Sequence, residues 1–203
     1  MPAPDLMALV RAIATRDSKK SQQLLAADPD LARQAVPTGA TRQVSREFYF
    51  DDIGHYVYAG DTALHVAAAA HDRKTAAVLL AKGANPDARN RRGATPLHYA
   101  ADGAPGSPAW NPAAQAETIE ALIDAGADPD ALDKSGVAPL HRAVRTRCAA
   151  AVKALIAKGA DHRLKNKGGS TPLDLATRTT GRGGSGTPAA KEQQAQILAL
   201  LRR

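Results

Sequence analysis

The chain has 203 residues, of which only 3% are aromatic, and it carries a formal net charge of +7. So few aromatic residues argue against a β-sandwich or barrel, whose strands are rich in aromatic and β-branched side chains. The single cysteine, Cys148, excludes an intramolecular disulfide, and without a Cys/His cluster a structural zinc site is not expected. The sequence shows neither a secretory leader nor a membrane-length apolar run, so we expect a cytoplasmic chain with no membrane partner.

Residues 5–34 predict a pair of short helices. Apolar residues at helical spacing form one face of the first helix, which Asp5 can cap. Asp17 or Ser18 can cap the second helix, which we expect to end near Ala27. We interpret this pair as a degenerate N-terminal unit with a polar outer face, as the end of a stacked array requires.

Residues 35–59 interrupt the helical pattern with an aromatic insert. Five of the seven aromatic residues of the chain lie between Phe48 and Tyr58. Aromatic and β-branched residues flank the tetrapeptide Asp51-Asp52-Ile53-Gly54, which predicts a hairpin with a four-residue turn. The insert is either a packing device or a recognition arm, and the sequence leaves both interpretations open.

His55 lies beside Asp51 and Asp52 in this insert, and the three form an acid–histidine cluster. A metal-binding or hydrolytic site at residues 48–58 is therefore an alternative function. No nucleophile, Gly-rich phosphate loop or HExxH motif accompanies the cluster, so we expect a turn with solvated carboxylates, without a metal or cofactor.

Four related hexapeptides then recur along the chain. They are Gly60-Asp61-Thr62-Ala63-Leu64-His65, Gly93-Ala94-Thr95-Pro96-Leu97-His98, Gly136-Val137-Ala138-Pro139-Leu140-His141 and Gly169-Ser170-Thr171-Pro172-Leu173-Asp174. Their first glycines are separated by 33, 43 and 33 residues, a period that indicates stacked repeats. We assign repeats to residues 60–92, 93–135 and 136–168, and a C-terminal capping repeat to residues 169–203.

Each repeat predicts two helices. The Thr-Pro pair of the hexapeptide suits a first helical turn, because Thr can cap a free N–H and Pro has none to leave unpaired. The second helices are expected over residues 74–82, 113–125, 149–158 and 188–201. A Pro/Gly-rich insertion at 103–112 explains the longer period of the second repeat, and a Gly/Ser/Thr stretch at 178–188 predicts a flexible insertion in the last.

The hexapeptides together with their surroundings resemble the ankyrin repeat family. Residues 92–101, which read Arg-Gly-Ala-Thr-Pro-Leu-His-Tyr-Ala-Ala, are close to the family consensus, and Gly-Ala-Asn or Gly-Ala-Asp follows three second helices on period. The clear resemblance covers residues 58–177. It implies an all-α solenoid of about five helix pairs, with the aromatic hairpin-like insert before the first full repeat.

The resemblance also implies a non-enzymatic, monomeric module that binds a protein through its concave face and the loops between repeats. The family's variable positions, with the insert, give these candidate partner-binding residues: Tyr58, Asp61, Arg91, Arg92, Asp102, Lys134, Arg142, Arg145, Lys167, Arg178, Phe48, Tyr49 and Tyr56. The preference for Arg and Ala hints at a GC-rich bacterial genome.

The motif histidines His65, His98 and His141 have a catalytic or metal-binding alternative, but recurrence at one repeat position favours a structural role. Asp174 replaces the histidine in the last repeat, and this replacement argues against a row of metal-binding histidines. Trp110 either packs its loop onto the helices or marks a contact. Cys148 is interpreted as a small residue in a helix seam rather than an activated thiol.

Charge is spread unevenly along the chain. Residues 1–57 are neutral, residues 58–133 carry a net charge of −4, and residues 134–203 carry +11. The basic residues form a solvated surface, an acidic-protein site or a nucleic-acid site. Since residues 134–203 contain no Phe, Tyr or Trp, while nucleic-acid surfaces usually combine charge with aromatic rings, we expect an acidic protein partner.

Overall fold

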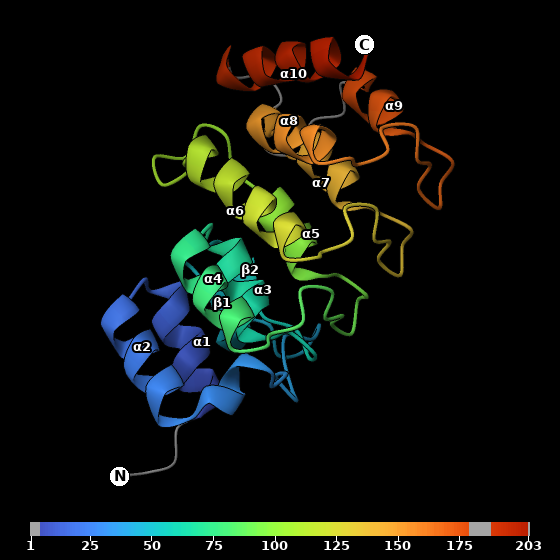
Figure 1. Ribbon diagram of the computed structural model, residues 1–203. Coiled ribbons are helices and arrows are strands. Elements are labelled where there is room, and N and C mark those ends of the chain that lie inside the picture. The colour runs from blue at the N-terminus through green and yellow to red at the C-terminus, as the bar shows by residue number, and fades with distance from the viewer. Residues whose placement is uncertain (1–4, 179–187, 203) are drawn as a thin grey trace.

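The computed structural model describes residues 5–178 and 188–202, and within them ten α-helices form five pairs stacked in chain order (Figure 1). The predicted all-α solenoid of five helix pairs is therefore confirmed. The expected flexible insertion at 178–188 lies outside the described residues except at its two ends. The helices are α1 (Leu6–Ala14), α2 (Ser18–Ala27), α3 (Ala63–Ala69), α4 (Arg73–Ala81), α5 (Pro96–Ala101), α6 (Pro112–Asp124), α7 (Pro139–Arg145), α8 (Ala149–Ala157), α9 (Pro172–Thr177) and α10 (Pro188–Leu201).

Side-chain caps fix where several helices begin. The Asp5 carboxylate accepts a hydrogen bond from the Met7 N–H, and Asp17 accepts one from Lys20. Asp72 and Asn111 cap α4 and α6 in the same manner. These contacts satisfy backbone donors that have no partner inside the helix, so short helices of this kind start at defined residues.

The second helices end one residue earlier than predicted, because the residue before each glycine is the C-cap. Lys82, Ala125 and Lys158 hold these positions, and the glycines that follow have φ between 85° and 98°. A feature missed from sequence lies between the two helices of three pairs. There Arg16, His71 and Arg147 adopt left-handed backbone conformations, with φ of 59°, 51° and 60°.

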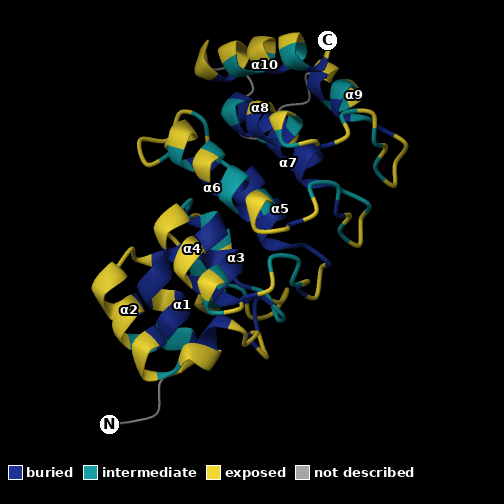
Figure 2. Cartoon of the chain, viewed as in Figure 1, coloured by how far each residue is buried: buried dark blue, intermediate teal, exposed yellow. Residues whose placement is uncertain are grey.

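The core is a continuous apolar seam between the helix pairs. The leucine of the first three hexapeptides, Leu64, Leu97 and Leu140, is at most 1% exposed, and the second helices add Leu79 and Leu122. Burial of each such side chain stabilises the fold by about 2 kcal/mol. Figure 2 shows α3, α5 and α7 largely buried and α2, α4 and α6 with exposed outer stripes.

The insert folds into a small two-stranded sheet, as predicted. Strands β1 (Tyr49–Phe50) and β2 (His55–Tyr56) pair antiparallel with Tyr49 opposite Tyr56, and residues 51–54 form the four-residue turn. Short 3-10 helices, Pro29–Ala32 and Arg46–Phe48, precede the strands. The Val36 N–H donates to the Asp61 carbonyl at 2.7 Å, which ties the base of the insert to the first full repeat.

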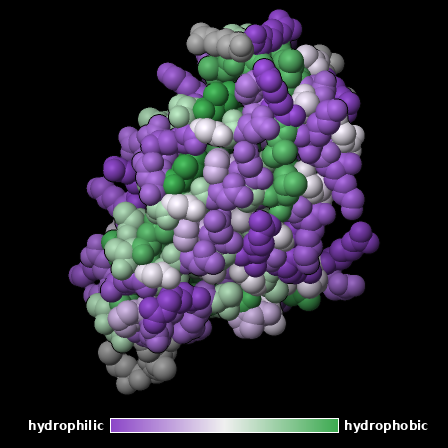
Figure 3. All heavy atoms as spheres, turned by 45° about the vertical axis from the view of Figure 1, so that its right-hand side comes forward, coloured by the Kyte–Doolittle hydropathy of each residue, from purple (hydrophilic) through white to green (hydrophobic). Residues whose placement is uncertain are grey.

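Long finger loops, residues 82–95, 125–138 and 158–171, project to one side of the stack, on the right in Figure 1. We call these loops together with α3, α5, α7 and α9 the inner face. Figure 3 turns that side toward the viewer and shows a mostly hydrophilic surface with small hydrophobic areas. Among the described residues, no helix is both long and apolar enough to cross a membrane.

Candidate functional site

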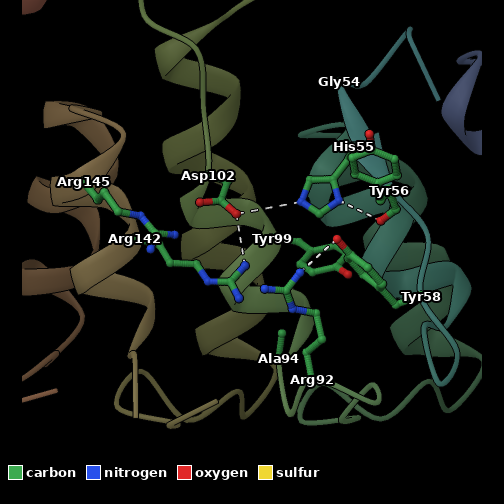
Figure 4. A pocket seen from close by; sticks show the side chains of 10 residues that line it. All are labelled: Gly54, His55, Tyr56, Tyr58, Arg92, Ala94, Tyr99, Asp102, Arg142 and Arg145. Carbon is green, nitrogen blue, oxygen red and sulfur yellow. Dashed lines mark hydrogen bonds and ion pairs between the residues drawn. The ribbon is translucent and has the colours of Figure 1, made fainter. Parts of the chain in front are cut away.

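A cavity of about 210 Å³ lies on the inner face, between the insert and helices α5 and α7. Its walls come from three parts of the chain that are far apart in sequence. The lining residues are Gly54, His55, Tyr56, Tyr58, Arg92, Ala94, Tyr99, Asp102, Arg142 and Arg145. Figure 4 shows their side chains converging from the hairpin, from α5 with its finger loop, and from α7.

Arg142 is held rigidly on one wall of this cavity. Its Nη1 donates to Asp102 Oδ2 at 3.0 Å and its Nη2 to Asp133 Oδ2 at 3.1 Å, while the side chain is only 9% exposed. Burial disfavours its charge, but the two carboxylates outweigh burial and raise the pKa of Arg142. Arg142 Nε is buried without a hydrogen-bond partner among the described residues. The sequence placed Arg142 among partner-contacting residues, and the structure places it in this carboxylate network, with its side chain lining the cavity.

His55 points to Asp102 and away from its sequence neighbours. Its Nε2 lies 3.8 Å from Asp102 Oδ2, its Nδ1 donates to the Tyr56 carbonyl at 2.9 Å, and its ring lies against Tyr99 with centroids 4.1 Å apart. For Asp102, burial opposes ionisation, but His55 and Arg142 together lower its pKa.

The cluster of His55 with Asp51 and Asp52 is therefore not assembled. Asp51 and Asp52 are exposed on the turn, while the His55 ring faces the inner helices. Across residues 5–178 and 188–202, no group of three or more His, Cys, Asp or Glu side chains is placed to hold a metal ion. The residues that meet at His55 instead suit hydrogen bonding and charge recognition.

Asp61 was predicted to contact a partner, but it is completely buried and organises the fold. Its carboxylate accepts hydrogen bonds from the Tyr58 N–H at 2.7 Å, Asn90 Nδ2 at 2.8 Å and the Tyr99 hydroxyl at 3.0 Å. Burial, followed by the charge of Asp61, raises the pKa of Tyr99. This network joins the insert, the first finger loop and α5, so Asp61 supports the cavity without facing it.

The other predicted basic residues are exposed along the inner face. Arg91 and Arg92 lie in the finger loop before α5, Lys134 before α7 and Lys167 before α9, and Arg145 and Arg178 lie at the ends of α7 and α9. Within the described residues, the side chains of Lys134, Arg145 and Lys167 make no hydrogen bond or ion pair. None of the three charged groups is therefore in direct contact with an internal anion, although the charge of Arg145 contributes to lowering the pKa of Asp102.

Two of these cations already engage the insert. The guanidinium carbons of Arg91 and Arg92 lie 5.3 Å and 5.0 Å from the centre of the Tyr58 ring. Arg92 Nη1 also donates to the Tyr58 hydroxyl at 2.9 Å, and Arg91 donates to the Ala40 carbonyl. Cation–π contacts of this kind orient both guanidinium groups, and that of Arg92 lies at the rim of the cavity.

The insert's other aromatic residues divide between packing and exposure. Phe50 and Ile53 pack against the core, while Phe48 and Tyr49 are half-buried. The Tyr56 ring packs against Tyr49 in a tilted arrangement, with centroids 4.7 Å apart, and Tyr56 remains 37% exposed. The insert therefore serves as packing and still presents an aromatic surface.

The structural interpretation of the motif histidines is confirmed. In each, Nδ1 accepts from a backbone N–H at its own helix start, while Nε2 donates to a carbonyl of the next repeat. For His65 that carbonyl is Ala94, at 3.1 Å; for His98 it is Val137, at 2.8 Å; for His141 it is Ser170, at 3.2 Å. Both ring nitrogens are therefore hydrogen-bonded, and Nε2 joins each of these repeats to the next.

Trp110 and Cys148 also have packing roles. Trp110 Nε1 donates to Gln115 Oε1 at 2.9 Å, and Gln115 in turn donates to the Ala100 carbonyl, which ties the 103–112 loop to α5 and α6. Cys148 is fully buried at the start of α8, and burial raises the pKa of its thiol to about 11. The thiol is therefore not an activated nucleophile.

Sequence reasoning missed Tyr99, although a signal for it was present. The residue after the motif histidine or aspartate is Val66, Tyr99, Arg142 or Leu175 in successive repeats. The two polar members of this set line the cavity, and the two apolar members do not. The signal available in the sequence was therefore a polar residue at a repeat position that is apolar in two of the four repeats.

Three ankyrin models match the chain: ankyrin repeats (3 copies) over residues 12–107, an ankyrin repeat over 92–134, and ankyrin repeats (many copies) over 122–176. The chain belongs to the ankyrin repeat family. Ankyrin repeats are generally protein–protein interaction modules, and proteins of the family are typically non-enzymatic scaffolds. Among curated proteins, the comparison found no match to this chain.

Proposed function

We propose that this protein binds an acidic protein partner through its inner face. The observation that carries the proposal is the alignment of exposed cations on successive repeats, from Arg92 through Lys134 to Lys167. A row of like charges on one face raises the local concentration of an oppositely charged partner and speeds its association. The cavity and the exposed Tyr56 add a place where contacts become specific.

Nucleic acid is a weaker candidate for the same surface. The structure does bring aromatic rings near Arg91 and Arg92, which the sequence alone did not place there. However, Tyr58 is already engaged by both guanidinium groups, and base stacking needs a free ring face. The basic residues from Lys134 onward have no Phe, Tyr or Trp among residues 134–203.

The test is a charge-reversal triple variant, Lys134→Glu, Arg145→Glu and Lys167→Glu. These three residues are exposed and their side chains make no hydrogen bond or ion pair within the described residues, so circular dichroism should report an unchanged helical fold. The matched control is Lys19→Glu, Lys74→Glu and Lys153→Glu, which makes the same charge change on the outer helices α2, α4 and α8.

Each immobilised protein captures partners from the native lysate at increasing salt. The inner-face variant should lose the partners that the unmodified protein retains, and the outer-face control should keep them. Retention of every partner by the inner-face variant would refute the proposal. A single-stranded oligonucleotide titration at low salt accompanies it, and tight, strongly salt-dependent binding would favour nucleic acid instead.

A further inference from the structure

The cavity beside the insert has features that suit the binding of a single anionic group, and the rest of the inner face lacks them. We infer that it is the receptor for one anionic side chain, a carboxylate or a phosphate ester, presented by the acidic partner. This inference rests on the proposed function and names the contact that would give it specificity.

The first support is how the cavity is made. Gly54, His55, Tyr56 and Tyr58 come from the 35–59 insert, so this wall exists only because the repeat period is interrupted. Packing against the core explains the half-buried Phe50, but it does not explain the exposed Tyr56 that lines the cavity. Its volume of about 210 Å³ is below the roughly 300 Å³ at which pockets for drug-sized ligands begin, which suits one side chain.

The second support is the charge balance of the lining. Arg142 is matched by Asp102 and Asp133, so the floor is internally neutralised. At the rim, the Arg92 guanidinium is hydrogen-bonded only to the neutral Tyr58 hydroxyl, and the Arg145 guanidinium makes no hydrogen bond or ion pair among the described residues. Two guanidinium groups therefore line the cavity without a direct hydrogen bond or ion pair to an anion, and the charge of Arg145 acts on Asp102 only at longer range (Figure 4).

The third support is unused hydrogen-bonding capacity. Arg142 Nε is a buried donor with no acceptor among the described residues, on a side chain that is 9% exposed and lines the cavity. The Tyr58 hydroxyl accepts from Arg92 and keeps its own proton to donate. Anionic oxygens accept several such bonds at once, and charge-assisted hydrogen bonds are the stronger kind.

The aromatic walls suit the stem of such a side chain. Tyr56 and Tyr58 lie near each other, with centroids 6.3 Å apart, and the His55 ring continues toward Tyr99. Methylene groups can pack on these rings while the anionic end reaches Arg92 and Arg145. The arrangement discriminates against a neutral amide, because a glutamine would leave both rim cations unpaired.

The experiment is a peptide titration followed by two-dimensional ¹⁵N NMR of the full chain. Three peptides differ at one position only: Gly-Ser-Gly-Glu-Gly-Ser, the same peptide with Gln, and the same peptide with phosphoserine. The Glu or the phosphoserine peptide should shift the backbone amides of Gly54, Ala94 and Asp102 in the millimolar range, and the Gln peptide should not. Whichever anionic peptide binds more tightly identifies the source of the group.

Arg145→Gln should weaken that binding about tenfold, the size of one lost charge-assisted hydrogen bond, while Lys153→Gln on α8 should leave it unchanged. Equal shifts with the Gln peptide, or shifts at Lys167 and Arg178 with none at Gly54 and Ala94, would overturn the inference. If the charge-reversal triple variant nevertheless loses its partners, the inner face remains the binding surface and only the cavity assignment fails.

Discussion

At the scale of single residues, one imidazole ring joins each repeat to the next. His98 Nδ1 accepts from the Thr95 N–H at 3.1 Å and Nε2 donates to the Val137 carbonyl at 2.8 Å. His98→Ala leaves both backbone groups without their partner, so we expect the free energy of unfolding to fall by about 2 kcal/mol. Urea unfolding measures this, with the half-buried, non-motif His162→Ala as control. Equal midpoints for the two variants would contradict the role.

The same histidines predict a pH dependence of stability. Burial lowers the pKa of His65, His98 and His141, to about 4 for His98, below the usual 6.5. The unfolded chain therefore binds protons first, so stability is full above about pH 6.5 and falls as the pH drops toward 4. His98 alone would contribute a loss on the order of 3 kcal/mol.

Urea unfolding at about pH 7 and about pH 4.5 checks this dependence, with His98→Gln as the comparison. The variant cannot gain that proton, so its free energy of unfolding should change less between the two pH values. Parallel losses in the two proteins would show that His98 does not carry the effect.

Cys148 gives a third prediction at this scale. It is fully buried and its pKa is raised to about 11 by burial, so little thiolate is present near neutral pH. A chromogenic thiol reagent should react with the native chain at least about a hundredfold more slowly than with the urea-unfolded chain, in line with the small populations of open states. Since the chain has one cysteine, the readout is unambiguous. A native rate equal to the unfolded rate would refute the burial.

At the scale of elements, a comparison of two glycines distinguishes the cost of a left-handed backbone conformation from the cost of a clash between neighbouring finger loops. Gly93 and Gly126 both have positive φ, 75° and 98°. A Cβ on Gly93 would lie 2.9 Å from the Lys134 nitrogen in the next finger loop, whereas one on Gly126 would meet nothing within 4 Å. Gly126→Ala should cost about 1 kcal/mol from the left-handed conformation alone.

Gly93→Ala should cost at least about 1 kcal/mol more than Gly126→Ala, because the neighbouring finger must also move. Thermal or urea unfolding of the pair measures the difference. Equal costs would mean that the finger loops do not pack closely through their backbones.

The elements also show what the sequence could predict. Helix pairs, their caps and the four-residue hairpin turn depend on neighbouring residues, and all were predictable to within a residue or two. The seating of the hairpin was not, because His55 meets Asp102 and Tyr99 across long sequence separations. The sequence suggested the wrong partners for His55, namely its near neighbours Asp51 and Asp52.

At the scale of the whole molecule, the fixed repeat period predicted the solenoid. The insert at 35–59, which interrupts that period, forms part of the candidate site. The repeat pattern identified which positions face the inner side, and six predicted cations are exposed there. It did not distinguish Asp61 and Arg142, which are buried in carboxylate networks that include Tyr99 and Asp133 from neighbouring repeats. Such networks depend on several repeats together and leave no pattern within one.

The central claim is that the partner docks on the inner face, and photo-crosslinking tests it most directly. A benzophenone amino acid replaces Lys134 on the inner face or, in a second protein, Lys153 on the outer helix α8. After irradiation in native cells, mass spectrometry identifies the crosslinked peptides. We predict a partner crosslinked from position 134, through a segment rich in Asp and Glu, and absent at position 153. Crosslinks from position 153 alone, or to a basic segment from position 134, would contradict the claim.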